Sequence, residues 1–98
     1  MQAELGNPAI DRMPKHGALD RGDIANVRDS HGRLLAVECK NTSKIALSGW
    51  MREAHTAAAN YGAHTGVIVH KRHGTAAPGS QWVTLTVDDL IHLLKGTP

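Results

Sequence analysis

The sequence of 98 residues predicts one α/β domain in which helices pack on a mixed β-sheet. Three observations support this fold class. Several short runs are rich in β-branched and apolar residues, one longer run repeats its apolar residues at helical spacing, and the order is strand, strand, strand, helix, strand, strand, helix. A chain of this length leaves no room for a second hydrophobic core, so residues 1–98 are expected to form a single domain.

The first elements are short. Residues 9–13 form a weakly apolar run that stops at Pro14, and a basic, glycine-containing loop follows over residues 15–22. Residues 23–28 and 34–40 are strand-like and flank the turn-forming residues 29–32, which predicts a hairpin.

Two registers are open for this hairpin. A connection with an even number of residues pairs Arg28 with Arg33, so that paired positions sum to 61 and Asp23 lies opposite Glu38. A three-residue loop with a bulge at Gly32 gives sums of 62 instead and turns Asp23 to the other face, unless another bulge corrects it.

The next segment is expected to be an amphipathic helix from about residue 44 or 47 to Tyr61. Asn41, Thr42 and Ser43 are capping residues ahead of it, and Gly62 ends it. Its apolar residues recur at steps of three and four: Leu47, Trp50, Met51, Ala54, Ala57, Ala58 and Tyr61. Because this stripe is mostly alanine, the helix is expected to lie close to the sheet.

The last third contains two strands and a helix. Residues 65–70 are an apolar, β-branched run typical of a central strand, and it leads into the basic residues 71–73. Residues 82–85 form another strand. Thr86 is expected to cap a final helix through Leu94, which has two aspartates in its first turn, where the helix dipole favours acids.

Composition excludes several classes of protein. A single cysteine, Cys39, excludes an intramolecular disulfide, and no apolar run reaches the roughly 20 residues of a membrane span. The N-terminus lacks the pattern of a signal peptide, so a soluble, intracellular protein is expected. The net charge is +2, and residues 1–80 carry ten basic and seven acidic residues, a balance of +3. This surface becomes distinctly basic if a divalent cation neutralises the acids.

Asp23, Glu38 and Lys40 are the candidate catalytic residues. Glu38 and Lys40 lie two apart on one face of their strand, and in the first register Asp23 faces Glu38 at about 5 Å between Cβ atoms. Opposed carboxylates repel unless a cation separates them, and Mg²⁺ is commonly held by one or two carboxylates. Lys40 is then placed to orient or deprotonate a water molecule, which favours phosphodiester hydrolysis. An ordinary ion pair on an exposed sheet is the alternative.

These residues lie in a recognisable pattern. Gly22-Asp23-Ile24, a hairpin and Val37-Glu38-Cys39-Lys40-Asn41 resemble the PD-(D/E)XK nuclease superfamily. The stretch 17–24, with Glu38-x-Lys40-Asn41 and a helix containing Trp50, is similar to its small phage and archaeal Holliday junction resolvase-like branch.

The resemblance implies a restriction-endonuclease-like fold whose N-terminal helix is shortened or missing. It also implies Asp23 and Glu38 as ligands of Mg²⁺, for which Mn²⁺ substitutes, and Lys40 as the catalytic lysine. The expected activity is cleavage of branched DNA in the cytoplasm of a prokaryotic or phage-infected cell. A catalytically weak DNA-binding module and a non-specific nicking or end-processing nuclease are the alternatives.

Two departures from the family pattern name accessory candidates. The family's first helix usually supplies a glutamate, for which Glu4 is the candidate remnant. The later helix in several branches offers a Gln and, four residues on, a Tyr; Tyr61 is present, but Ala57 occupies the Gln position. Glu53, one turn earlier, is either a substitute or a solvated acid. Asp20 is either a further acid of the site or a turn-stabilising residue.

DNA and a second copy of the chain are the expected partners. The candidate phosphate contacts are Lys15, His16, Arg21, Asn41, Lys44 and Arg52. Residues 71–73 are either a DNA-contacting loop or a charge cluster that blunts a sheet edge. Trp50, Met51 and Trp82 are large apolar groups that a homodimer would bury; the alternative is a monomer whose tryptophans fill its own core.

Overall fold

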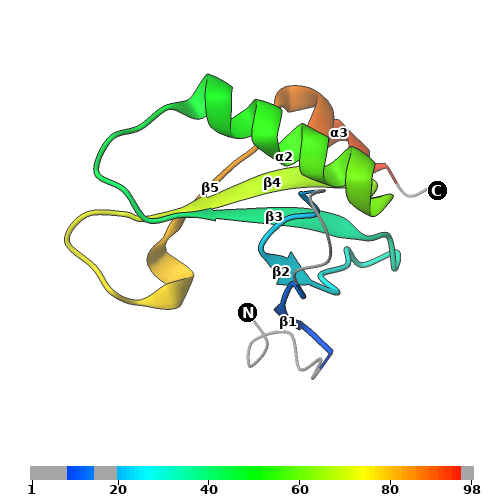
Figure 1. Cartoon of the computed structure of the whole chain (residues 1–98), viewed down its shortest axis with the longest axis horizontal. Coiled ribbons are helices and arrows are strands. Elements are labelled where there is room, and N and C mark those ends of the chain that lie inside the picture. Colours follow the sequence, from blue (N-terminus) through cyan, green and yellow to red (C-terminus); the bar gives the residue numbers. More distant parts are fainter. Residues whose placement is uncertain (1–8, 15–19, 96–98) are drawn as a thin grey trace.

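The computed structural model describes residues 9–14 and 20–95, and in this part it is an α/β domain with a five-stranded mixed sheet and two α-helices (Figure 1). The sheet order is β1 (Asp11–Arg12), β2 (Ile24–Ala25), β3 (Leu35–Lys40), β4 (Thr65–His70) and β5 (Trp82–Thr84). The α-helices are α2 (Leu47–Tyr61) and α3 (Val87–Leu94), and η1 (Pro78–Ser80) is a 3₁₀ turn. This confirms the predicted fold class and element order. No helix among these residues has the length and hydrophobicity needed to cross a bilayer.

Strands β3 and β4 form the parallel centre of the sheet, and α2 is the crossover that joins them. The remaining neighbours in the sheet pair antiparallel. Because β3 and β4 are parallel, the segments that follow Lys40 and His70 leave the sheet at the same end (Figure 1). Lys40 and the basic residues 71–73 therefore lie at this end of the sheet.

Small residues allow α2 to lie close to the sheet, as the alanine stripe predicts. Ala54, Ala57 and Ala58 of α2 are buried on the side of the helix that faces the sheet. On the strand below, a Cβ atom at Gly66 would stand 2.5 Å from the Ala54 carbonyl oxygen, so this position has no room for a side chain. Trp50 is also buried and packs with Ala54 against Ile68 of β4.

The ends of α2 confirm one prediction and correct another. Gly62 adopts the left-handed conformation (φ 67°), and its N–H is directed at the last carbonyls of the helix, as expected of a C-terminal glycine. The expectation that residues 41–43 cap the helix is wrong, because the N-cap is Ala46 and no side chain caps it. Thr42 lies too far ahead and accepts the Lys44 N–H instead.

Residues on the two faces of β3 enter different parts of the core. One face contributes to a cluster made up of Ile10, Val27, Leu35, Val37 and Val67. On the other face, Ala36 packs under α2 with Ala57 and Ala58. Because side chains alternate along a strand, Glu38 and Lys40 share the face of Ala36, which α2 covers.

The hairpin between β2 and β3 uses both expected registers in turn. Near the turn, Arg28 bridges to Leu34 and the Leu35 N–H donates to the Val27 carbonyl, so these positions sum to 62. Farther along, Ile24 pairs with Val37, and the sum becomes 61. The expected pairing of Arg28 with Arg33 is therefore wrong.

A bulge at residues 25 and 26 makes the change of register. Ala25, the last residue of β2, and Asn26 after it both oppose Ala36, and Asn26 takes the left-handed conformation at φ 66°. The freed Asn26 N–H donates to the Tyr61 hydroxyl at 3.2 Å, and the Asn26 side chain donates to the Ala9 carbonyl at 2.7 Å. This bulge is the correction that the register with sums of 62 requires, and beyond it Asp23 bonds to Val37 and Cys39, the two sequence neighbours of Glu38.

Candidate active site

Asp23 is fixed to β3 on both sides of Glu38. Its backbone N–H donates to the Val37 carbonyl at 2.7 Å, and its Oδ2 accepts the Cys39 N–H at 2.7 Å. Glu38, which lies between Val37 and Cys39 in the sequence, is only 5% exposed.

Asp20 joins the same cluster and also stabilises a turn, so both interpretations of this residue have structural support. Its Oδ1 accepts the Gly22 N–H at 2.9 Å, and its carbonyl accepts the side-chain amide of Asn60 at 2.7 Å. Gly22 has φ 90°, and a Cβ atom there would lie 3.1 Å from the Val37 carbonyl oxygen. Glycine is needed for this close approach, which brings residues 20–23 against β3.

The carboxyl group of Glu38 is destabilised as an anion. Burial, hydrogen bonding with Asp20 and the negative charge of Asp23 together raise the pKa of Glu38 from 4.5 to about 8. Within the described residues no N–H or O–H group donates to its buried Oε1. At neutral pH Glu38 therefore retains a proton. A cation bound to the cluster would take the place of that proton.

The donor chemistry fits a small divalent cation. Asp23 and Glu38 supply carboxylate oxygens. Mg²⁺ is usually held by one or two carboxylates, and water molecules complete its coordination shell. Among residues 9–14 and 20–95, no set of three or more His, Cys, Asp or Glu side chains is already arranged as a metal centre. Asp23 and Glu38 are thus the pair to consider as ligands, with Asp20 adjacent.

Lys40 lies beside the cluster and forms an ion pair with Glu53 of α2. The hydrogen bond that Lys40 donates to Glu53 and the negative charges of Glu53, Glu38 and Asp23 raise the pKa of Lys40, although partial burial opposes this. Lys40 is therefore an ammonium ion at neutral pH, suited to orienting water and stabilising negative charge rather than to accepting a proton. The sequence left two interpretations of Glu53, a substitute site residue and a solvated acid. In the structure Glu53 contacts the site through its ion pair with Lys40.

The other predicted site residues fall into three groups. Tyr61 lies outside the acidic cluster, where its hydroxyl supports the bulge at Asn26. Four of the candidate phosphate contacts are at the surface, half-buried or exposed: Arg21, Asn41, Lys44 and Arg52. Three candidates lie outside the described residues: Glu4, Lys15 and His16.

Residues 71–81 form an ordered loop next to Lys40, because the Lys71 N–H donates to the Lys40 carbonyl at 3.1 Å. Gln81 organises this loop. Its side-chain amide donates to the carbonyls of Thr75 and Ala77, and its Oε1 accepts the Arg72 N–H at 2.8 Å. Sequence reasoning missed Gln81, since a lone glutamine in a polar loop forms no pattern.

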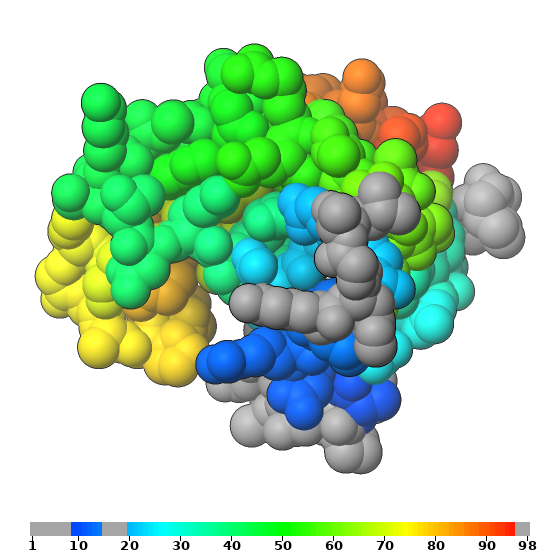
Figure 2. Space-filling model, viewed as in Figure 1, coloured from blue at the N-terminus to red at the C-terminus, as the bar shows by residue number. Residues whose placement is uncertain are grey.

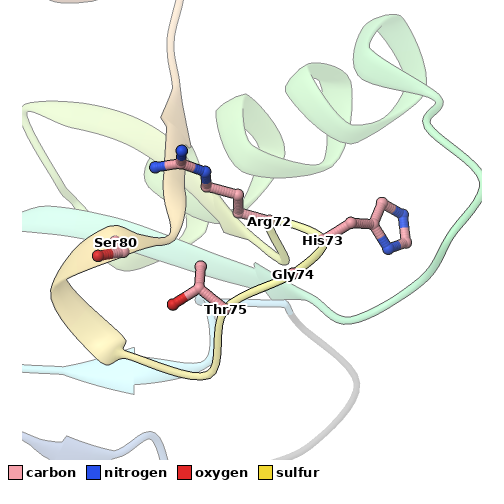
Figure 3. A pocket seen from close by; sticks show the side chains of 5 residues that line it. All are labelled: Arg72, His73, Gly74, Thr75 and Ser80. Atoms are coloured by element: carbon pink, nitrogen blue, oxygen red, sulfur yellow. The ribbon is translucent and has the colours of Figure 1, made fainter.

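The loop carries an open pocket of about 280 Å³ lined by Arg72, His73, Gly74, Thr75 and Ser80 (Figure 3). The Arg72 guanidinium lies 4.6 Å from the centre of the Trp82 ring, a cation–π contact. Figure 3 shows the side chains of Arg72 and Ser80 on one side of the loop and the His73 ring directed to the other. In the described part of the chain no carboxylate pairs with Arg72, so its charge is available to an external anion.

Comparison of the chain with protein-family models, with curated proteins and with solved structures found no match. Function is therefore inferred from the acidic cluster, Lys40 and the adjacent basic loop.

The raised pKa of Glu38 predicts how stability depends on pH. Between pH 4.5 and about 8 the folded protein retains a proton that the unfolded chain releases. The metal-free protein is therefore expected to lose up to about 5 kcal/mol of unfolding free energy as the pH rises through this window. Urea denaturation in EDTA at several pH values measures it.

Glu38→Gln is the control for this pH dependence, because an amide cannot titrate there. The variant should flatten the profile over this pH window and should be the more stable protein at its alkaline end. Equal slopes for the variant and the parent would show that Glu38 titrates normally.

Proposed function

We propose that the chain is a Mg²⁺-dependent DNA endonuclease of the PD-(D/E)XK type with a restriction-endonuclease-like fold, acting on branched DNA. The observation that carries the proposal is the bulge at Asn26, beyond which Asp23 bonds to both sequence neighbours of the buried Glu38. A structural ion pair has no need of two opposed acids, of which one is buried with an oxygen that receives no hydrogen bond. The order of hairpin, helix and parallel strand supports the same proposal.

The residues divide the proposed chemistry between them. Bound Mg²⁺ would lower the pKa of a coordinated water molecule and polarise the phosphodiester; Mn²⁺ is expected to substitute. Asp23 and Glu38 would hold the ion, and Asp20 would add negative charge beside it. Lys40 would orient the attacking water and stabilise the negative charge that develops on the phosphorus oxygens. Glu53 would keep the Lys40 side chain aligned.

The DNA backbone would run along the end of the sheet where β3 and β4 stop. The segment after β3, coloured green, and the loop 71–81, coloured yellow, lie on the same side of the molecule (Figure 2). Lys44 and Arg52 are exposed around the first segment, and Arg72 belongs to the second. Once a cation has neutralised the acids, these groups leave a basic rim suited to phosphates.

Arg72→Ala is expected to weaken DNA binding about three- to tenfold, because the pocket loses its cation. The slope of log binding constant against log salt concentration should fall by about one, which corresponds to one phosphate contact. Fluorescence anisotropy of labelled DNA across a salt series measures both, in a Glu38→Gln background that prevents cleavage. Arg28→Ala is the matched control, since Arg28 donates to the Gly32 carbonyl in the hairpin turn. Equal losses in the two variants would contradict a specific contact at Arg72.

The direct test is incubation of the protein with labelled four-way junction, linear duplex and single-stranded DNA, each with Mg²⁺, Mn²⁺ or EDTA. We expect paired cuts in the junction with either metal and none in EDTA. Cleavage of all substrates alike would favour a non-specific nicking or end-processing nuclease. Binding without cleavage under every condition would contradict the nuclease and leave the DNA-binding module.

A further inference from the structure

Helix α3 exposes a continuous aliphatic stripe. Val87 and Leu94 are each 74% exposed, Leu90 is 45% exposed and Ile91 is 42% exposed. Their spacing of three, one and three residues places all four along one side of the helix. A surface helix ordinarily turns such a stripe toward its own core, so this stripe is expected to have another partner.

The contacts of α3 fix the stripe outward. Thr86 and Asp89 form a reciprocal capping box at the first turn, and Asp89 also bonds to His55 of α2 at 2.9 Å. At the other end, the Arg33 guanidinium donates to the carbonyls of His92 and Lys95, both at 2.9 Å. Leu93, on the inner side, packs against the core. Rotating the stripe inward would break these contacts.

The charges beside the stripe are complementary to those of a second copy. At 100° per residue, Asp88, His92 and Lys95 lie on one flank of the stripe, with the acid at the N-terminal end and the bases at the C-terminal end. Two copies of α3 packed antiparallel about a two-fold axis place Asp88 of each beside Lys95 of the other. A parallel two-fold pair would place the charged flanks of the two helices on opposite sides of the interface, so it would lack these contacts.

We propose that α3 is the interface of a homodimer in which the two helices pack antiparallel through Val87, Leu90, Ile91 and Leu94. The contacts of α3 with Arg33 and His64 place it where β3 and β4 begin, away from the end that carries Lys40 (Figure 1). Both candidate active sites therefore stay accessible in the dimer. This interface differs from the one expected from sequence, because Trp50 is only 7% exposed and fills its own core.

Analytical ultracentrifugation of the full chain in EDTA tests the interface without DNA or cleavage. The parent should sediment with twice the monomer mass of 10.5 kDa at micromolar concentration. Leu90→Glu should weaken the dimer about a hundredfold or more, with an unchanged circular dichroism spectrum, because it places a charge at the centre of an apolar contact. Ser48→Glu, at an exposed position on α2, is the matched control and should remain dimeric.

A charge swap tests the antiparallel arrangement. Asp88→Lys should weaken association about tenfold, and adding Lys95→Asp should restore it, because the swap exchanges the two ends of each contact. A parent that stays monomeric at hundreds of micromolar overturns the proposal, as does a Leu90→Glu variant that dimerises like the parent. Failure of the double variant to recover overturns the antiparallel pairing. Because Glu38→Gln leaves α3 intact, it should remain dimeric whether or not the chain is a nuclease.

Discussion

Glu38→Gln is expected to reduce metal-dependent cleavage by about a thousandfold or more while leaving the fold intact, because it removes one of the two proposed metal ligands and preserves shape. Glutamine fits the space and relieves repulsion from Asp20 and Asp23, which raise the pKa of Glu38 in the parent. Asp23→Asn should cause a similar loss of activity. Single-turnover cleavage of a labelled four-way junction, with denaturation curves for each variant, measures both effects.

Asp11→Asn is the matched control for this charge change. Asp11 is exposed on β1, and its side chain accepts only the neighbouring Arg12 N–H among the hydrogen bonds described. It should therefore cleave at the parent rate. The Mg²⁺-induced rise in melting temperature should be present in the parent and in Asp11→Asn and lost in Glu38→Gln. Full activity of Glu38→Gln would place the active site elsewhere on the chain.

Periodicity predicts the elements of this fold well, because each strand and helix carries its own pattern. The alternation along β3 correctly assigns Glu38 and Lys40 to one face, and the alanine stripe of α2 correctly predicts its close approach to the sheet. The helix start is less predictable. Ser, Thr and Asn before a helix stabilise either the cap or a preceding turn, and here Thr42 stabilises the turn.

The register of the hairpin could not be predicted from sequence, because it depends on one backbone angle. Asn26 is among the residues that tolerate positive φ, and the Tyr61 hydroxyl and the Ala9 carbonyl, both distant in sequence, accept its N–H groups there. The position of Asp20 likewise depends on Asn60, which is 40 residues away. Helix α3 has a clear apolar stripe, but sequence alone does not show that Asp89 and Leu93 occupy its inner side.

Lys40→Ala is expected to reduce turnover about a hundred- to a thousandfold while the protein still binds Mg²⁺, because the lysine acts on the developing charge and not as a ligand. Its raised pKa implies that it contributes as a cation, so Lys40→Arg should recover part of the rate. Glu53→Gln should have a smaller effect, since it releases Lys40 from its ion pair without removing the ammonium group.

The comparison of these variants separates catalysis from stability. If the Lys40–Glu53 pair were merely structural, Lys40→Ala and Glu53→Gln would lower stability similarly and leave the rate per folded molecule unchanged. We expect instead a large loss of rate for Lys40→Ala alone, at pH values where both variants remain folded. The midpoint of the Mg²⁺ titration, followed by melting temperature, should stay near that of the parent in both, because Asp23 and Glu38 remain in place.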